Sequence, residues 1–324
     1  MIKVGIPRGL LFYRYFPLWE TFFESLGVEV VVSVSTTDEL IRKGSKLLPG
    51  DLCLPMKIFF GHVESIKGEV DFLFVPRYIS IEPEAYMCPK LIGLPDMLLS
   101  VTDSLPRLID DPIDCRANGR DAERSFYLKA GKIFLKDNTK VERAYGLGLE
   151  RQARFRLLLR KGFSFEEGVT FSRSINDSEK REEEGRMRLG LIGRPYYTHD
   201  PYLRKLILEQ VEKKGFQLLT SDILSDQEIE SGVEKLRKRI YWSFGKELVG
   251  SAICLARDRS VRGIINLASF GCGQDSFNFE MIQYTIREEV PMLSLIFDEH
   301  LSSGGFSTRV EAFLEMIVRG VEKK

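Results

Sequence analysis

The sequence predicts an α/β protein made of two related domains, each with a parallel sheet covered by helices. Short apolar strands alternate with amphipathic helices near both ends of the chain, which is typical of parallel sheets with helical crossovers. The two regions also open alike, with Gly5-Ile6-Pro7-Arg8 after the first strand and Gly193-Arg194-Pro195 after the later one. A chain of 324 residues, 44% of them hydrophobic, is long enough for about two domains.

The first region has a strand–helix–strand pattern that is then repeated in part. Gly27 is expected to end the first helix, because glycine tolerates the left-handed conformation common at helix C-termini. The expected elements are strands at 3–6, 28–34 and 72–75, and helices at 18–26 and from after Cys53 to Ile66.

The second region restarts the same alternation. Gly215 is expected to end its first helix. The expected elements are strands at 188–192, 217–220, 263–267 and 292–297, and helices at 202–214, 233–257, from Cys272 onward, and at 308–321.

These patterns divide the chain into an N-terminal α/β domain at 1–115, a helical connector at 116–185 and a C-terminal α/β domain at 186–324. The connector carries helical patterns such as 147–160. Its charged stretch at 173–186 is expected to be exposed and mobile.

Composition argues against two classes of partner. Lysines plus arginines equal aspartates plus glutamates, at 47 each, so the sequence gives no electrostatic reason to expect binding to nucleic acid or to an anionic membrane surface. We find no apolar run of signal-peptide or membrane-spanning length and expect a cytoplasmic protein. Cysteines there are metal-binding, catalytic or buried more often than disulfide-bonded.

Three of the five cysteines share one local context. Cys53, Cys88 and Cys272 each precede the first turn of an expected helix and stand near proline or glycine. Helix starts offer unpaired N–H groups and the positive end of the macrodipole, which favour a thiolate. Cys88 and Cys272 also follow apolar strands, at the sheet edge where open α/β folds bind ligands. The pattern predicts a thiolate-bound metal centre.

The competing interpretation is that each of these cysteines is a small buried hydrophobic residue, because no compact C-x-x-C motif is present. The other two cysteines are expected to be structural. Cys254 lies among apolar helical neighbours and is expected in the core. Cys115 is expected in a loop, where adjacent carboxylates raise its thiol pKa.

Three thiolates could bind either of two kinds of metal centre, a zinc ion or an iron–sulfur cluster. A zinc ion would need a fourth ligand or a water, and the histidines offer little: His62 lies nine residues after Cys53, and His199 and His300 have no partner at ligand spacing. A cubane iron–sulfur cluster with one open iron suits soft ligands better.

Several short motifs occur along the chain in an order that resembles a known family. They are Gly5-Ile6-Pro7-Arg8-Gly9-Leu10, Cys53-x-Pro55-x-Lys57 with Gly61-His62, Tyr86-x-Cys88-Pro89, Phe270-Gly271-Cys272-Gly273, and Asp298-Glu299-His300 followed by Thr308-Arg309-Val310-Glu311-Ala312-Phe313. The set resembles the acyl-CoA dehydratase activase-related proteins, relatives of 2-hydroxyacyl-CoA dehydratase subunits and double-cubane-cluster proteins.

The resemblance implies Rossmann-like domains that hold a [4Fe-4S] cluster in the interdomain cleft through Cys53, Cys88 and Cys272. It also implies an electron-donating partner, a separate ATP-hydrolysing activator with its own cluster. The chain itself shows no Walker A motif. Three ligands are too few for a double cubane, which favours a single cluster or one shared between subunits of a homo- or hetero-dimer. Dehydratase activity does not transfer, because no motif identifies an acyl-CoA pocket.

Seven further residues are candidates for positions beside a cluster or a substrate. Lys57 and Lys90 could offset cluster charge or be ordinary solvated lysines, and Gln274 follows Cys272 on the first helical turn. The matching loops supply Arg8, Arg194, Tyr196 and Tyr197. These could bind an anionic or carbonyl-bearing substrate, or form interdomain salt bridges.

The leading hypothesis is an oxygen-sensitive iron–sulfur protein that carries out low-potential one-electron transfer. In an extended form of this hypothesis, the electron is used to reduce or dehydrate a substrate at the open iron. Whether it is an oxidoreductase, a dehydratase-like lyase or no enzyme stays open. The rivals are a non-catalytic accessory or regulatory protein of a dehydratase-type complex, and a zinc or metal-free small-molecule-binding protein.

Overall fold

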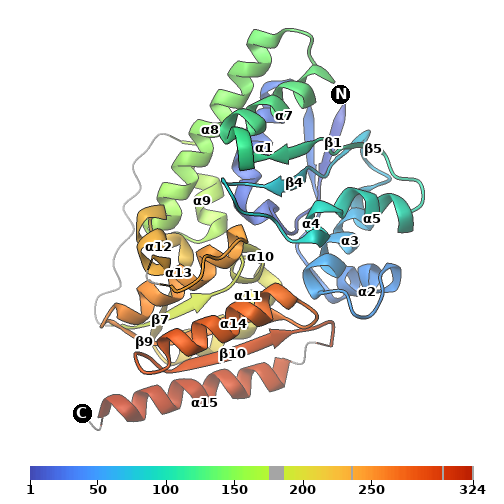
Figure 1. The fold of residues 1–324 in the computed structure, drawn as a ribbon. Helices are drawn as coiled ribbons and strands as arrows, with labels where there is room; N and C mark the ends of the chain where they lie inside the picture. Colours follow the sequence, from blue (N-terminus) through green and yellow to red (C-terminus); the bar gives the residue numbers. More distant parts are fainter. Residues whose placement is uncertain (175–185, 235, 301–302, 323–324) are drawn as a thin grey trace.

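The computed structural model describes residues 1–174, 186–234, 236–300 and 303–322 (Figure 1). Most of the charged stretch expected at 173–186 therefore lies outside the described residues. The two parallel sheets that the sequence predicts are confirmed, and they are consistent with two Rossmann-like domains.

The first sheet is built early in the chain and has the strand order β2-β1-β3-β5, with every pair parallel. Its strands are β1 (Lys3–Ile6), β2 (Glu29–Val32), β3 (Phe72–Phe74) and β5 (Arg107–Ile109). The helices of this half are α1 (Phe12–Ser25), α2 (Asp38–Leu47), α3 (Leu54–Ile66), α4 (Pro89–Ile92) and α5 (Leu94–Val101). A separate parallel pair, β4 (Arg77–Ser80) with β6 (Pro112–Asp114), was not expected from the sequence.

Between the sheets the chain is helical. The elements are α6 (Cys115–Asn118), α7 (Arg120–Lys132), α8 (Asn138–Arg160) and α9 (Phe165–Phe171). The long helix α8 packs along α1, and Gly148 lies so close to Leu18 that an added Cβ would be 2.9 Å from the Leu18 carbonyl oxygen. The connecting helices thus lie directly against the first half.

The second sheet has the order β10-β9-β7-β8, again wholly parallel. Its strands are β7 (Met187–Ile192), β8 (Phe216–Thr220), β9 (Val261–Ser269) and β10 (Met292–Phe297). The helices of this half are α10 (Pro195–Thr198), α11 (Pro201–Lys213), η1 (Ser221–Ile223, a 3-10 turn), α12 (Asp226–Val233), α13 (Ser243–Arg257), α14 (Gly273–Ile286) and α15 (Ser303–Glu322).

Two helices differ from the sequence-based expectation. Helix α1 begins at Phe12 rather than at residue 18, and its first turns, which precede Pro17, bury Phe12, Tyr13 and Phe16. The helix expected at 233–257 begins only at Ser243, as α13, and α12 has already ended at Val233. Just before α13 the chain pairs with the first half, where Tyr86 N–H donates to the Tyr241 carbonyl at 2.8 Å.

One hydrophobic cluster runs through both halves of the molecule. It joins Phe12 and Tyr13 of α1 to Leu191 of β7 and Phe244 of α13. A second cluster lies within the second half, between β9, α13 and α14. Because the first cluster is shared, the two sheets are held in a fixed relation by buried apolar surface.

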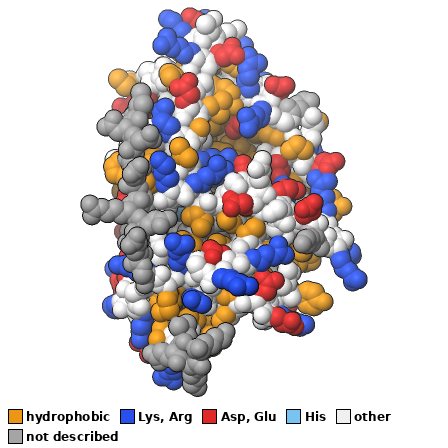
Figure 2. Space-filling model, turned by 90° about the vertical axis from the view of Figure 1, so that its left-hand side faces the viewer, with side chains coloured by type: hydrophobic (Ala, Val, Ile, Leu, Met, Phe, Trp, Pro, Cys, Tyr) orange, Lys and Arg blue, Asp and Glu red, His pale blue; other side chains and the backbone are white. Residues whose placement is uncertain are grey.

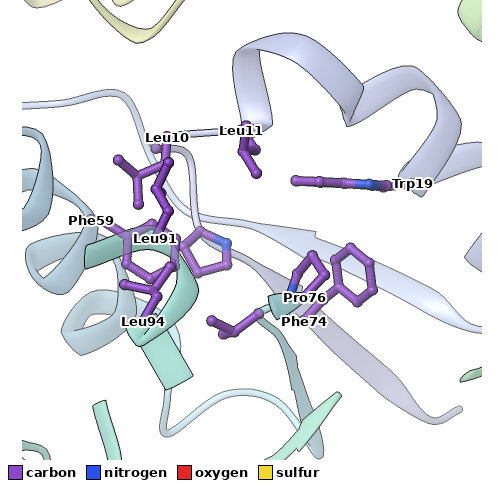
Figure 3. Close-up of a pocket in the computed structure, with 11 residues that line it drawn as sticks. Leu10, Leu11, Trp19, Phe59, Phe74, Pro76, Leu91 and Leu94 are labelled. Carbon is purple, nitrogen blue, oxygen red and sulfur yellow. The ribbon is translucent and has the colours of Figure 1, made fainter. Parts of the chain in front are cut away.

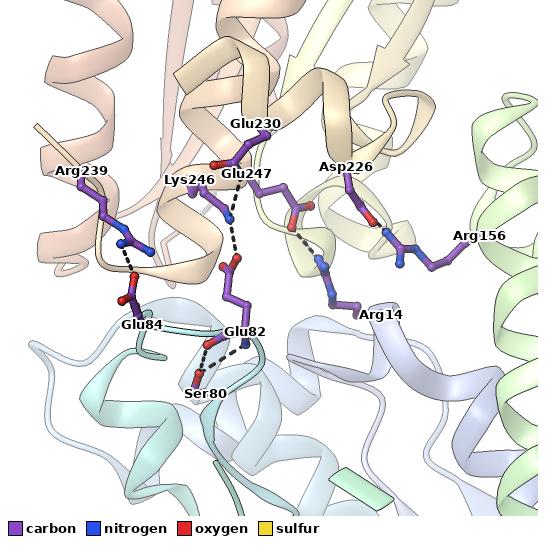
Figure 4. Close-up of polar contacts among 10 residues, drawn as sticks. All are labelled: Arg14, Ser80, Glu82, Glu84, Arg156, Asp226, Glu230, Arg239, Lys246 and Glu247. Atoms are coloured by element: carbon purple, nitrogen blue, oxygen red, sulfur yellow. Dashed lines mark hydrogen bonds and ion pairs between the residues drawn. The ribbon is translucent and has the colours of Figure 1, made fainter. Parts of the chain in front are cut away.

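Ion pairs reinforce the junction of the halves (Figure 4). Arg14 pairs with Glu247 at 2.6 Å, and Lys246 pairs with Glu82 at 2.5 Å. Farther along the junction Arg239 pairs with Glu84, and Arg156 of α8 reaches Asp226 of α12 at 2.7 Å. Most of these groups are partly exposed, and exposed ion pairs add little to stability. We therefore expect them to help orient the two halves rather than to contribute much to the free energy of unfolding.

The outer surface mixes charges of both signs. Figure 2 shows lysine and arginine side chains interspersed with aspartate and glutamate over the face that it draws, in keeping with 47 residues of each sign. None of the described helices combines the length and apolar character that crossing a bilayer requires.

A buried polar chain also crosses the junction. His62 of α3 makes hydrogen bonds with Ser33 at 3.0 Å and Thr36 at 3.1 Å, and Thr36 donates to Asp200 at the start of α11. Tyr13 donates to the same carboxylate at 3.0 Å. Burial, assisted by the charge of Arg8, lowers the pKa of His62 from 6.5 to about 3, so the imidazole is neutral in the folded protein.

Acid should therefore destabilise the protein through His62. Below pH 6.5 the histidine of the unfolded chain becomes protonated, whereas His62 in the folded protein stays neutral down to about pH 3. The unfolded state therefore binds more protons, and unfolding becomes more favourable as the pH falls. We expect the wild type to lose about 1.5 kcal/mol more unfolding free energy than His62→Gln between pH 6.5 and 5, measured by urea denaturation. The comparison isolates His62, because Arg8 and Asp200 are present in both proteins. Parallel pH profiles would contradict it.

Candidate metal centre

Each of the three cysteines that the sequence singles out is the N-cap residue of a helix. Cys53 precedes α3, Cys88 precedes α4 and Cys272 precedes α14. The backbones of Cys53 and Cys88 are nearly identical, with φ near −65° and −68° and ψ of 147° in both, the extended conformation usual for an N-cap residue. At Cys88 the following Pro89 also favours it. The expected helix-start position is therefore confirmed for all three.

The loop that carries Cys272 lies against the turn that carries Cys53. Gly271 has a φ of +73°, and a Cβ placed there would stand 2.6 Å from the Asp51 carbonyl oxygen. The Leu54 amide, one residue after Cys53, donates to Ser269 Oγ at 3.1 Å. Only a glycine satisfies both the left-handed backbone and this close approach.

Helix α4 reaches the same loop. Lys90 Nζ, two residues after Cys88, donates to the Gly271 carbonyl at 3.3 Å. The three cysteines, separated by 35 and 184 residues in the sequence, are thus brought to one place where the first half meets the second.

The thiols are close enough for their charges to interact. Burial raises the pKa of Cys53, a charge on Cys88 raises it further, and Lys90 opposes both. Burial likewise raises the pKa of Cys272 to about 12, with Asp275 and Cys53 adding to the shift and Arg194 opposing it. At these two residues burial therefore opposes the thiolate form that a helix start is expected to favour.

The arrangement does not suit a single ion. Within the described ranges, no group of three His, Cys, Asp or Glu side chains is placed to hold one metal ion. Zinc binds sulfur at about 2.3 Å and so needs its ligands close together, whereas the ligands of a cubane bind different iron atoms and stand farther apart. Three sulfurs are soft donors and suit a cluster better than zinc, which usually takes a fourth protein ligand or a water.

Two of the histidines are engaged elsewhere. Both ring nitrogens of His62 face hydroxyl groups, and His199 Nε2 is 2.9 Å from Asp222. Asp222 keeps a pKa of about 2, since the charge and hydrogen bond of His199 overcome the cost of burial. These contacts are structural and lie away from the cysteines.

A buried ion pair supports the Cys272 turn from behind. Arg194, 2% exposed, donates from Nε to Asp275 at 2.8 Å and from Nη2 to Gln274 at 2.9 Å. Tyr197 donates to the second Asp275 oxygen at 3.2 Å, and the Asp275 amide points at Cys272 Sγ at 3.4 Å. Because its carboxylate is held on both sides, Asp275 fixes the first turn of α14 and thereby the Cys272 sulfur.

Tyr196 completes this side of the site. Its ring packs edge-on against Tyr197 with centroids 4.8 Å apart, and it is 9% exposed. Burial raises the pKa of Tyr196, and charges on Cys272 and Cys88 would raise it further, so its hydroxyl stays protonated beside the thiols.

Of the seven surrounding residues that the sequence suggests, five gather at the cysteines and two do not. The five are Lys90, Arg194, Tyr196, Tyr197 and Gln274. Lys57 is instead buried and pairs with Glu299 at 2.6 Å, also donating to the Gly50 carbonyl. Arg8 lies 3.7 Å from Glu166 and over the Phe12 ring, so its guanidinium braces the connecting helix α9.

The other two cysteines correct the sequence-based expectation. Cys115 begins the short helix α6 and is buried rather than lying in a loop, although its pKa is raised to about 11 by burial with added effects of Glu123 and Asp114. Cys254 is half-buried rather than in the core, and its thiol donates to the Glu228 carbonyl at 3.0 Å. Cys254 lies on the side of α13 that packs against α12, where a Cβ on Gly232 would be 3.1 Å from its sulfur.

Sequence reasoning missed Ser269 and Glu299. Ser269 ends β9 and contacts the Cys53 turn, and Glu299 binds Lys57, one turn beyond Cys53. The partners are 215 and 242 residues apart, and no local pattern marks them as pairs. The only signal was that Glu299 and Lys57 both belong to the motifs that carry the family resemblance.

An apolar cavity lies behind the helices that carry Cys53 and Cys88 (Figure 3). It encloses about 20 Å³, room for about one water molecule, and is lined by Trp19, Phe59, Leu91 and Leu94 among others. A more open groove of about 400 Å³ runs between α7 and the β4–β6 pair. The apolar cavity is too small for an acyl chain.

Comparison with known families identifies the family of this chain. Residues 3–224, well over half of the chain, match the family model described as the CoA enzyme activase uncharacterised domain. The protein belongs to the CoA enzyme activase family. Residues 164–317 of this activase-family protein also match the model of the 2-hydroxyglutaryl-CoA dehydratase D-component, a stretch that contains Cys272. A comparison with curated proteins found no match.

The contact at Gly271 gives a sharp test of how the site is held together. Gly271→Ala should lower the unfolding free energy by about 2 kcal/mol or more, because its Cβ would meet the Asp51 carbonyl in a left-handed conformation. Gly273→Ala is the matched control: nothing lies within 4 Å of its added Cβ, and we expect a change within about 0.5 kcal/mol. Chemical denaturation measures both. Equal effects of the two substitutions would contradict the close approach.

Proposed function

We propose that this activase-family protein holds a [4Fe-4S] cluster through Cys53, Cys88 and Cys272 and uses it for low-potential electron transfer. The observation that carries the proposal is the convergence of three cysteines from distant parts of the chain, each at the start of a helix. The match to the dehydratase D-component adds support, because members of that family generally bind such a cluster. When bound, a cubane with three protein thiolates supplies one-electron chemistry and one iron open to another ligand.

The chain's own groups suit an anionic cluster. Backbone amides at two of the helix starts face sulfurs: Met56 N–H opposes the rise that burial causes in the pKa of Cys53, and Asp275 N–H donates to Cys272 Sγ at 3.4 Å. Lys90 and Arg194 add cationic charge, which Asp275 partly offsets. Binding iron would displace the protons of Cys53 and Cys272, so we expect cluster assembly to release protons and to be favoured by higher pH.

Tyr196 and Tyr197 bury neutral aromatic side chains beside the sulfurs. Both are at least nine-tenths buried, and both hydroxyls stay protonated because burial raises their pKa values. The Tyr197 hydroxyl already donates a hydrogen bond to Asp275. Tyr196 is the hydroxyl that remains to donate toward a bound oxygen.

We further propose that electrons come from a separate ATP-hydrolysing activator. The family description as a CoA enzyme activase domain favours such a partner, and the chain carries no Walker A motif of its own. Phe270, adjacent to the Cys272 turn, is 65% exposed, so its ring is accessible to such a partner. In the most extended form of the proposal, the transferred electron would be used to reduce or dehydrate an acyl-CoA or another small substrate at the open iron.

Iron and sulfide content test the proposal directly. After anaerobic purification or reconstitution, we expect about four irons and four acid-labile sulfides per chain with brown absorbance, the composition of a cubane. About half of that content would indicate a cluster shared between two subunits. The triple variant Cys53→Ser/Cys88→Ser/Cys272→Ser should lose the iron.

The remaining cysteines provide the matched control. Cys115→Ser/Cys254→Ser removes two thiols outside the site and should retain the full iron content. If the triple variant kept its iron while remaining folded by circular dichroism, the three cysteines would not be the ligands. Zinc or no metal in the reconstituted wild type would favour an accessory binding protein instead.

A further inference from the structure

Lys57 is a buried lysine one turn after Cys53, and its ammonium joins two separate loops. The side chain is only 1% exposed. Nζ donates to the Gly50 carbonyl at 2.9 Å, three residues before Cys53, and to Glu299 at 2.6 Å, in the loop after β10. The ammonium therefore connects the turn before α3 to a loop of the other half of the molecule.

Stability alone does not account for a lysine at this position. Burying an ammonium costs desolvation energy, and replacing a buried ion pair by apolar side chains of similar volume is often neutral or stabilising. Lysine is almost never fully buried unless it is paired. The first turns of α3 otherwise bury apolar side chains, among them Leu54, Met56, Ile58 and Phe59. An ammonium kept in this setting indicates a role in fixing geometry.

The turn that Lys57 holds is the one that carries Cys53. The Gly50 carbonyl accepts from the ammonium, and the next carbonyl, that of Asp51, stands against Gly271, where an added Cβ would be 2.6 Å from it. Two consecutive carbonyls of the turn are thus fixed, one by Lys57 and the other by the loop after β9. Displacing either contact would let the start of α3 move.

The ammonium acts through these hydrogen bonds rather than through its charge on the thiol. Burial raises the pKa of Cys53, and the cation that opposes this shift is Lys90 rather than Lys57. The charge of Lys57 is matched instead by Glu299, and the hydrogen bond between them lowers the pKa of that carboxyl. The effect of Lys57 on Cys53 is therefore one of position.

We propose that Lys57 is a positioning residue for Cys53, because its ammonium ties the turn before α3 to the loop after β10. The two partners Lys57 and Glu299 are 242 residues apart in the sequence, so the tie spans the junction of the halves. Its importance for a metal centre rests on the proposed function, since cluster ligands must stand at set positions. The positioning itself is testable in cluster-free protein.

Thiol alkylation, resolved by peptide mass spectrometry, provides the readout. The cluster-free full-length protein is treated with iodoacetamide under native conditions. Cys53 is 8% exposed and should react slowly, and Cys115, 6% exposed and outside the site, is the internal reference. Lys57→Met keeps an apolar stem and removes the ammonium, so Cys53 should react about tenfold faster while Cys115 is unchanged.

The matched control is Lys67→Met, the same substitution at the other end of α3. Lys67 Nζ also joins a carboxylate to a carbonyl, at 2.7 Å from Glu64 and 3.0 Å from the Asp103 oxygen, but it is far from the Cys53 turn along the helix. Both alkylation rates should stay at the wild-type value. An equal acceleration of Cys53 in Lys57→Met and Lys67→Met would overturn the proposal.

A second variant decides the question if Lys57→Met does not fold. Glu299→Gln keeps a neutral acceptor for the ammonium but loses the charge, so alkylation of Cys53 should be about threefold faster than in the wild type. Unchanged alkylation of Cys53 in the folded variants would overturn the proposal. Faster alkylation of Cys53 and Cys115 together would also overturn it, because that pattern indicates general loosening. None of these results depends on iron content, so failure here is distinguishable from failure of the cluster proposal.

Discussion

The approach of Gly271 to the Asp51 carbonyl is the contact on which the rest of the site depends. It places the loop after β9 against the turn before α3, and Lys90 then ties α4 to the same loop. Neither half contains all three cysteines, so the site exists only because the halves are packed against each other. The shared hydrophobic cluster fixes that packing, and the Lys57–Glu299 pair and the Leu54–Ser269 hydrogen bond set its register.

Burial is the largest influence on the protonation of the candidate site. It raises the pKa values of Cys53 and Cys272 although each caps a helix, and Arg194 is tolerated in the interior only because Asp275 and Gln274 take its donors. Burial therefore favours the neutral thiols of these two cysteines. Displacing their protons requires a ligand that compensates for burying negative charge, which an iron–sulfur cluster with its cationic irons does and a water molecule does not.

Local sequence patterns predicted the parts of this protein that are determined locally. The two parallel sheets follow from alternating strands and helices, and the helix-start position of each cysteine follows from a neighbouring proline or glycine. The late start of the helix expected at 233–257 did not follow, because Tyr241 and Trp242 pair with Tyr86, far away in sequence. For the same reason the sequence could not show that Lys57 pairs with Glu299, or that the thiol of Cys254 donates to Glu228 of α12.

Anomalous diffraction at the iron edge, from crystals grown and frozen without oxygen, would locate bound iron relative to the cysteines. We expect one compact iron peak at the junction of the halves, within bonding reach of the sulfurs of Cys53, Cys88 and Cys272 and of no other cysteine. Iron bound at Cys115 or Cys254, or a site that brings no iron to the three helix starts, would contradict it.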